Sequence, residues 1–284
     1  MTHRLAGHPE SIISFILIAL AFVAAYFLSQ PKWRKLGAKF ASLMLLFVGL
    51  ALLIESFLGY QTRPAVIPYI DDVKPSLLLI QGAIAFVCGA WLFRQKLAPG
   101  SETLQIKNQP QSYGAWSRYL HWSSAIIFLA LIPMGIYMTM IPEDAWYRHG
   151  YYVIHKTLGF TLFLLVLVRI VWNLSNDRPD ISKSLKPWEK SAAHAVHWVL
   201  YFLLLALPLS GYLMSSFADK PSHLFAWDFP SLLAPNDDLK QLFGFLHKVF
   251  LPYLCYLILG LHIIGALKHQ LIDKHSQALN RMTG

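Results

Sequence analysis

Histidines at the ends of apolar segments are the residues of this chain that point most directly to chemistry. The stretch FGFLHKVFLPYLCYLILGLHIIG, residues 243–265, has the length of a membrane-spanning helix and carries His247 near one end and His262 near the other. At a rise of about 1.5 Å per residue, these imidazoles lie about 22 Å apart, most of the hydrocarbon thickness of a bilayer. Because ionisable groups within a membrane span are costly and tend to be functional, this helix is predicted to offer a nitrogen ligand at each of two depths.

Two more histidines match these depths. His155 opens an apolar segment at the level of His247, and His121 opens another from the opposite side, at the level of His262. A single membrane histidine is commonly a polar group that hydrogen-bonds to a neighbouring helix. Pairs on facing helices suit the two axial positions of a haem iron, whereas zinc would need four ligands and neither level obviously supplies carboxylates or thiolates. We call His155 and His247 the outer pair, and His121 and His262 the inner pair, after the membrane sides predicted from the charged loops.

Two arginines are placed to serve the inner pair. Arg118 lies three residues before His121, on the same helix face, and Arg169 follows His155 by about 21 Å of helix, which brings it to the inner level. An arginine at that depth needs a partner, and a haem propionate would serve. The alternative for Arg169 is that its side chain extends to the cytoplasmic interface.

Lysines and glycines also accompany the predicted ligands. Lys156 and Lys248 directly follow the two outer histidines. They could hold propionates, raise the local concentration of anions, or simply anchor helix ends at the interface. Gly159 and Gly265 lie about one turn after a histidine of each pair, where a missing side chain would let a macrocycle approach the backbone, or let helices pack closely.

The two histidines of residues 243–265 do not share one face of a regular helix. Their spacing turns the helix by about 60° beyond whole turns. Pro252 lies between them, and a kink at this proline would change the direction in which each histidine faces.

The composition indicates an all-α integral membrane protein with seven transmembrane helices. Of 284 residues, 56% are hydrophobic and 14% are charged, and apolar segments of this length must be helical because lipid cannot satisfy an open backbone. Cys88 and Cys255 lie inside such segments, where apolar packing explains them. The candidate spans cover residues 11–29, 37–58, 76–93, 119–140, 153–174, 192–214 and 245–267.

The net charge of +9 invites a nucleic-acid interpretation, but its position argues against one. Lysines and arginines in the loops after the first, third and fifth spans and in the tail outnumber those on the other side by roughly two to one. By the positive-inside rule the loops PKWRK and DRPDISKSLKPWEK face the cytoplasm. The N-terminus is therefore expected outside and the C-terminus inside the cell.

A polar stretch divides the chain into two membrane regions. Residues 94–117 are interrupted by prolines and glycine and are expected to be a cytoplasmic linker. Residues 1–93 form a predicted three-helix region without haem ligands, in which Glu55 and Gln81 are the conspicuous polar groups. We interpret it as a packing or partner-docking unit, and residues 118–284 as a four-helix haem-binding bundle.

Residues 112–282 resemble the bacterial di-haem cytochrome b561 family of four-helix membrane cytochromes. The matching stretches are YGAWSRYLHW, YYVIHKTLGF, AAHAVHWVLYFLLLALPLSGYLM and LHKVFLPYLCYLILGLH. The resemblance implies two haem b groups, and it implies the axial iron ligands that the depths also favour, namely His121, His155, His247 and His262. It also implies a multi-pass protein of the bacterial inner membrane.

Three more histidines gain a possible role from the resemblance. The family has a histidine pair at the start of its third helix, which His194 and His197 match. They are not expected to be axial ligands and would lie near the inner haem or a quinone, although a simple interfacial helix start is the alternative. His269 could also reach the cytoplasmic interface.

The predicted function is electron transfer across the membrane. Haems with two histidine ligands have no open iron position and usually pass electrons. The resemblance implies a quinone partner, and members that oxidise superoxide outside while reducing ubiquinone. We expect a membrane oxidoreductase of the superoxide:quinone type or a respiratory electron carrier. The alternatives are an anchor subunit that passes electrons between a partner dehydrogenase or soluble redox protein and quinone, and a non-redox, histidine-lined transporter.

Overall fold

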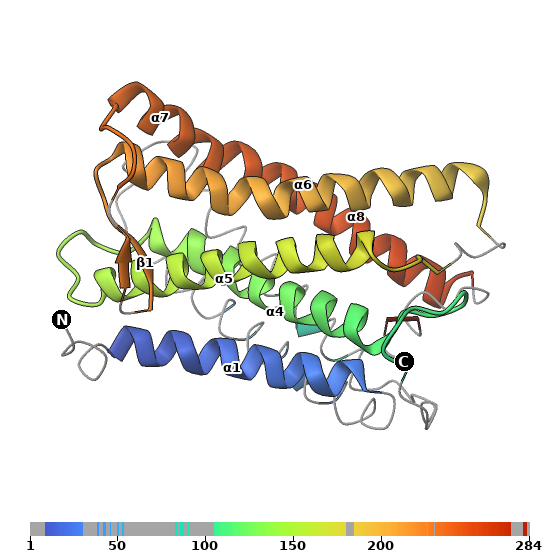
Figure 1. The fold of residues 1–284 in the computed structure, drawn as a ribbon. Coiled ribbons are helices and arrows are strands. Elements are labelled where there is room, and N and C mark those ends of the chain that lie inside the picture. The colour runs from blue at the N-terminus through green and yellow to red at the C-terminus, as the bar shows by residue number, and fades with distance from the viewer. Residues whose placement is uncertain are drawn as a thin grey trace.

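The described part of the protein is a helical bundle with a short hairpin (Figure 1). Its structure is a computed structural model, which describes residues 9–30, 105–179, 185–225, 227–229, 231–273 and 281–282, and single residues between 39 and 90. The elements are α1 (Pro9–Ser29), α4 (Ala115–Met138), α5 (Arg148–Leu174), α6 (Pro187–Phe217), β1 (Ser222–Leu224), β2 (Trp227–Phe229), α7 (Asp237–Phe245), the π-helical turn η2 (Leu246–Phe250) and α8 (Leu251–Leu271).

Within the residues that the structure describes, five helices are long and apolar enough to cross a membrane, so the chain is an all-α, multi-pass membrane protein. The candidate membrane segments are Ile12–Ser29, Ala115–Met138, Arg148–Leu174, Pro187–Phe217 and Asp237–His269. They correspond to five of the seven predicted spans. The other two predictions, 37–58 and 76–93, fall outside the continuously described segments, as do Glu55, Gln81, Cys88 and residues 94–104 of the predicted linker.

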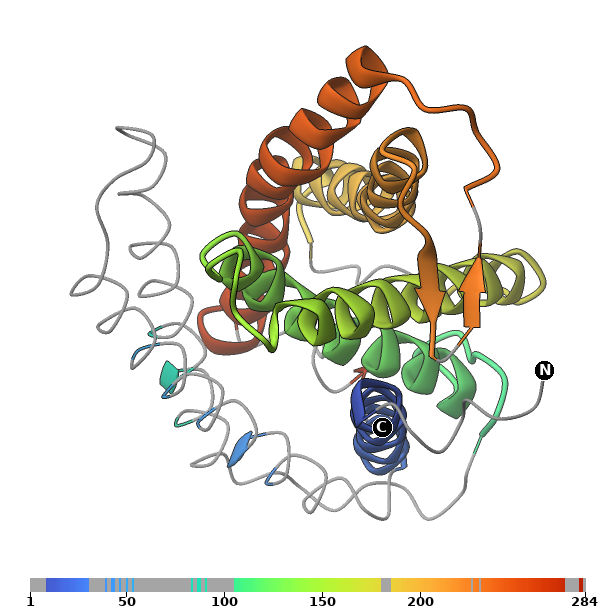
Figure 2. The ribbon, with the colours of Figure 1, turned by 90° about the vertical axis from the view of Figure 1, so that its left-hand side faces the viewer.

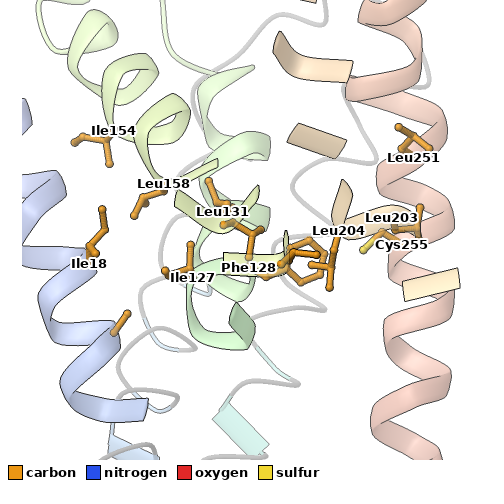
Figure 3. Packing of buried hydrophobic residues seen from close by; sticks show 13 residues of the cluster. Ile18, Ile127, Phe128, Leu131, Ile154, Leu158, Leu203, Leu204, Leu251 and Cys255 are labelled. Carbon is orange, nitrogen blue, oxygen red and sulfur yellow. The ribbon is translucent and has the colours of Figure 1, made fainter. Parts of the chain in front are cut away.

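The helices form a bundle to which α1 adds a further member. α4 packs against α5, α5 against α6, and α6 against α7 and α8. α1 contacts α4 and α5 on the side of α4 that faces away from α6 (Figure 2). A continuous apolar core reaches from Ile18 on α1, through Phe128 and Leu203, to Cys255 on α8 (Figure 3). Since Cys255 is 1% exposed within this core, it packs as an apolar residue.

The sequence explains how α1 comes so close to α4. Its buried positions include Ser14, Ile18, Ala21, Ala25 and Leu28, which recur every three or four residues and therefore lie on one helix face. Most of them are small, and small residues allow the backbones of membrane helices to approach each other. The first predicted span thus belongs to the core of the bundle.

Local signals fix the starts of two helices. Before α6, the Lys186 amide donates to the Glu189 carboxylate over 2.9 Å, and Pro187 occupies the first helical position, where a missing N–H costs nothing. Before α7, the Asn236 side-chain oxygen accepts from the Leu239 amide at 3.0 Å.

The last part of the predicted linker is tied to the bundle. The Asn108 oxygen accepts from the Gly114 amide at 2.9 Å and from the Ser117 hydroxyl at 2.7 Å, while its Nδ2 donates to the Asp177 carbonyl at 2.9 Å. A Cβ at Gly114 would lie 2.2 Å from the Ile106 carbonyl oxygen, so only glycine fits this close approach. The segment therefore clamps the start of α4 to the end of α5.

A π-helical turn precedes α8 and contains His247. The Leu251 amide donates to the Leu246 carbonyl, five residues back. Pro252 has no N–H with which to continue the α-helical pattern onto Lys248, which favours this wider turn. A π-helical turn has more residues per turn than an α-helix. His247 therefore points in a different direction relative to His262 than it would in a regular helix.

Candidate functional site

The structure brings the depth-matched histidines together at the two ends of the bundle. The ring centroids of His155 on α5 and His247 on η2 lie 6.2 Å apart. Those of His121 on α4 and His262 on α8 lie 6.5 Å apart. The outer pair therefore joins α5 to the last membrane segment, and the inner pair joins α4 to it.

The separations suit one metal ion between each pair of rings. An imidazole nitrogen binds a metal at about 2.0 Å, and with roughly 1 Å from each nitrogen to its ring centre, two rings on one metal lie about 6 Å apart. In the described residues, the extensive backbone contacts of α8 are with α6 and η2 and not with α4 or α5. The histidines thus face each other across helices that are not packed tightly together.

The outer pair is anchored on the His247 side. Nδ1 of His247 lies 2.8 Å from the Leu207 carbonyl oxygen and 3.2 Å from the Ser210 hydroxyl. A carbonyl can only accept, so Nδ1 carries the proton and Nε2 keeps its lone pair. Metal-binding histidines commonly have such a partner, which fixes the ring and its tautomer.

Two glycines that were not predicted from the sequence leave space for the imidazole rings of the outer pair. A Cβ at Gly211 would lie 2.8 Å from Cε1 of His247, and one at Gly135 would lie 3.4 Å from Cε1 of His155. Their signal in the sequence is weak, because each glycine lies on a different helix from the ring it faces.

His155 has an unmet hydrogen-bonding demand. Its Nδ1 is one of two buried side-chain polar atoms without a partner in the described part of the chain. An unpaired buried nitrogen costs free energy, and such exceptions in a fold are informative. Together with the ring separations, this orphaned nitrogen indicates that the residues of the outer pair fit a bound metal group.

A hairpin covers the α5 end beside His155 (Figure 1). β1 and β2 pair antiparallel, and the Phe225 amide at their turn donates to the Thr157 hydroxyl at 3.1 Å. Nζ of Lys156 donates to the Pro221 carbonyl at 2.7 Å. Lys156 therefore helps to hold the hairpin, while Lys248 is exposed on the π turn.

The inner pair has a cation beside it. Nη2 of Arg169 lies 3.0 Å from Nδ1 of His121, and the guanidinium carbon lies 5.2 Å from the centre of the Tyr201 ring. The Tyr201 hydroxyl accepts from Nδ2 of Asn173 at 2.5 Å. Arg169 is thus held inside the bundle by a ligand candidate and an aromatic ring, whereas its predicted propionate contact stays a prediction.

Of the other inner histidines, one lies at the site. The His197 ring is 5.2 Å from the His262 ring, closer than His121 is. His194 is exposed on α6. Nδ1 of His269 lies 2.6 Å from a carboxylate oxygen of Asp273, at the end of α8.

This end of the bundle is loosely filled. From Pro187 to Phe202 no residue of α6 is buried, and none of the described side chains of α8 is buried after Cys255. A Cβ at Gly265 on α8 would have no atom within 4 Å, and the same holds at the other end of the bundle for Gly159, one turn from His155. The side chains of His121, His197 and His262 are accordingly only partly covered by the described residues.

Arg118 has a different environment from the one that its spacing suggested. It is 4% exposed, and its Nη2 and Nε donate to the Ser29 carbonyl at 2.8 and 3.1 Å. It also donates to the Tyr113 carbonyl. The guanidinium therefore satisfies the C-terminal end of α1, and these contacts lend no support to the predicted haem contact.

One acidic cluster near the inner end resembles a cation site only in its spacing. Ligand atoms of Glu189, His269 and Asp273 lie within 4.8 Å of one another. However, Nζ of Lys268 lies 2.8 Å from Glu189 and 3.0 Å from Asp273. An ammonium already neutralises these carboxylates, so the cluster is an ion-pair network that joins α6 to the end of α8.

Helices that cross the membrane and present two pairs of facing imidazoles define a class of protein, the membrane-bound b-type cytochromes. The chain belongs to the prokaryotic cytochrome b561 family, whose model matches residues 112–284. Membership implies haem b and electron transport. The matched region does not include α1.

Three similar proteins come from bacteria. Cytochrome b561 homolog 2 of Escherichia coli (strain K12) is 36% identical over 183 residues, which cover 64% of this chain and 96% of that protein. Cytochrome b561 homolog 1 of the same organism is 25% identical over 170 residues, 58% of this chain and 93% of that protein. The probable superoxide oxidase CybB of Yersinia pestis is 29% identical over 163 residues, 57% of this chain and 91% of that protein.

Proposed function

We propose that the chain carries electrons across the membrane between two haem b groups, one at the outer pair and one at the inner pair. The observation that carries this proposal is the position of two histidine pairs at opposite ends of one bundle, with ring separations of 6.2 and 6.5 Å. Bound haem would supply one-electron transfer at each position. Two imidazoles at each level would leave no iron position open for oxygen.

The residues between the two pairs have a role in this proposal. Phe128, Leu203 and Cys255 are buried between the two levels and form a dry, apolar layer. Such a layer excludes water and ions from the middle of the bundle, so that charge crosses without leakage through an aqueous path. His197 and Arg169 would form the polar wall at the inner level.

We further propose that the electrons pass from an outer-side donor such as superoxide to a membrane quinone at the inner end. The support is the similarity to the probable superoxide oxidase of Yersinia pestis and the partial exposure of the His197 and His262 side chains. This direction assumes the N-terminus outside and the C-terminus in the cytoplasm, as the loop charges favour. Residues 1–93 would be an accessory unit joined to the haem bundle of residues 118–284 through α1.

An anchor subunit that serves a partner redox protein is the second candidate, because hairpin and loop residues such as Trp146, Trp227 and Leu232 are exposed at the outer end. A stopped-flow experiment separates the two. The purified protein, reconstituted with quinone, is mixed with superoxide while haem reduction is followed. Rapid reduction followed by quinol formation supports the first candidate, and no reduction by superoxide favours the second.

The haem proposal itself is tested by a reduced-minus-oxidised visible spectrum and a haem count on the purified chain. Two haem b per chain are expected. A chain that binds none when expressed with sufficient haem would overturn the proposal and leave a histidine-lined transporter as the alternative.

A further inference from the structure

The two pairs differ in what faces the second nitrogen of a ligand candidate. At the outer pair, Nδ1 of His247 faces the Leu207 carbonyl at 2.8 Å, which can only accept a hydrogen bond. At the inner pair, Nδ1 of His121 faces Nη2 of Arg169 at 3.0 Å, which can only donate. The same atom of the same residue type therefore meets opposite partners at the two ends.

These partners act on a bound metal in opposite directions. A histidine that donates to a carbonyl becomes a more basic ligand, and this stabilises the oxidised metal. A fixed positive charge beside the ligand stabilises the state that has gained an electron. Arginine stays protonated under all ordinary conditions, so this charge does not depend on pH.

Of the two contacts of Arg169 at the inner pair, one remains when His121 binds a metal. A histidine that binds metal through Nε2 carries its proton on Nδ1 and then cannot accept from the guanidinium. The Tyr201 ring, 5.2 Å from the guanidinium carbon, is then the contact that keeps the cation in place. Among the ion pairs of the described residues, none involves Arg169, so no carboxylate there offsets its charge.

The lysines beside the outer pair do not cancel this difference. Lys156 directs its Nζ to the Pro221 carbonyl of the outer loop, and its contact is an exposed one. Lys248 is exposed on η2. Lys156 and Arg169 are both half-buried on α5, but the Lys156 contact at the outer loop is exposed to water and salt, whereas Arg169 lies between the His121 and Tyr201 rings, where screening is weaker.

We propose that Arg169 is a positioning residue that raises the reduction potential of the inner centre above that of the outer centre, so that electrons run downhill from the outer to the inner pair. In this step one electron leaves the outer centre, which is oxidised, and enters the inner centre, which is reduced, and no proton or atom moves. The electron comes from the outer-side donor and is removed by quinone. The inference rests on the proposed function, because it needs a haem at each pair.

The test is a potentiometric titration of the haem-loaded full chain, followed by its reduced absorbance bands. His155→Ala leaves only the inner centre to titrate, and His121→Ala leaves only the outer one. In the His155→Ala background, Arg169→Gln is expected to shift the equilibrium between the reduced and the oxidised inner centre at least tenfold toward the oxidised form. For one electron this corresponds to a reduction potential that is 59 mV lower. Arg169→Lys should shift it in the same direction by less, because the charge is kept but the planar contacts are lost.

The controls separate the charge from general damage. Lys240→Gln removes a positive charge at an exposed position of α7 and should leave both potentials unchanged. Arg169→Gln in the outer-only background should also leave that potential unchanged. If Arg169→Gln fails to bind the inner haem, Tyr201→Leu decides, because it removes the ring under the guanidinium and should lower the inner potential alone.

Three results would overturn the inference: an inner potential that no Arg169 or Tyr201 variant lowers, equal shifts in both centres, or an outer centre that is already the more easily reduced. A wild-type chain without haem would instead overturn the proposed function, so the two failures can be told apart.

Discussion

The outer and inner ends of the bundle carry the same pair of ligand candidates in different surroundings. At the outer end, His247 is fixed by a carbonyl, its ring faces Gly211, and a hairpin covers the neighbouring turn of α5. At the inner end, a third histidine and an arginine join the pair. A tightly fitted site holds its ligand in one geometry, while an open, polar one leaves room for a second molecule. This difference is consistent with the proposal that electrons enter at the outer pair and leave at the inner pair.

The comparison of the two ends fails if either histidine pair can be removed without loss of a haem. His247→Ala should remove the outer haem and His262→Ala the inner one, because each substitution deletes one of two nitrogen ligands. Each variant should retain about half the wild-type haem, measured by the reduced spectrum per protein. His269→Ala is the control and should keep both. A His197→Ala variant that loses a haem while His262→Ala does not would show that the inner pair is wrongly assigned.

The tight fit of the outer end is tested by Gly211→Ala. The added methyl would lie 2.8 Å from the His247 ring, and overpacking of this kind costs about 1–3 kcal/mol. The ring must move, so the outer haem should be lost or weakened while the inner one is kept. Gly260→Ala on α8 is the matched control, because nothing lies within 4 Å of its added carbon. Equal haem loss in both variants would contradict the fitted outer site.

Arg118→Ala tests whether the inner end depends on this arginine for haem or for packing. The guanidinium satisfies the Ser29 carbonyl, and leaving a buried acceptor unpaired costs about 1–3 kcal/mol. The variant should unfold at a lower temperature in detergent but keep both haems. Selective loss of the inner haem with unchanged thermal stability would instead support the propionate contact expected from the sequence.

The smallest effect concerns the ion pairs that close the inner end. Hydrogen bonds from Lys268 and then His269 hold the pKa of Asp273 below its usual value. A carboxyl with a lowered pKa contributes stability that is complete above its ordinary pKa and is lost as the pH falls through the lowered one. The melting temperature should therefore drop over that acidic interval, and less so in Asp273→Asn. Identical pH profiles would show that this network does not stabilise the inner end.

The histidines show how far sequence reasoning reaches into the site. Distance along a helix is fixed by a constant rise per residue, so the sequence could predict which imidazoles share a depth, and the structure brings those rings together. Hydropathy likewise predicted helices at the five described segments, although it placed the starts of α5 and α6 several residues late. Capping and aromatic residues at the interface extend these helices beyond their apolar parts.

The direction in which a side chain points around its helix axis was harder to predict from the sequence. His247 faces its partner from a π turn that Pro252 favours, and the sequence suggested a kink there without giving the resulting rotation. Arg118 illustrates the same limit, because its spacing from His121 did not predict that it would donate to the Ser29 carbonyl of α1, while its haem contact stays a prediction.

The sequence by itself determined the class of the protein, its membrane helices and the levels of its histidines, because hydrophobicity and helical rise act along one chain. Only the tertiary structure decided that Gly211 faces His247, that Leu207 anchors it, and that Arg169 lies on His121. Those contacts join residues of different helices, whose rotation and spacing depend on how the side chains of the whole bundle pack.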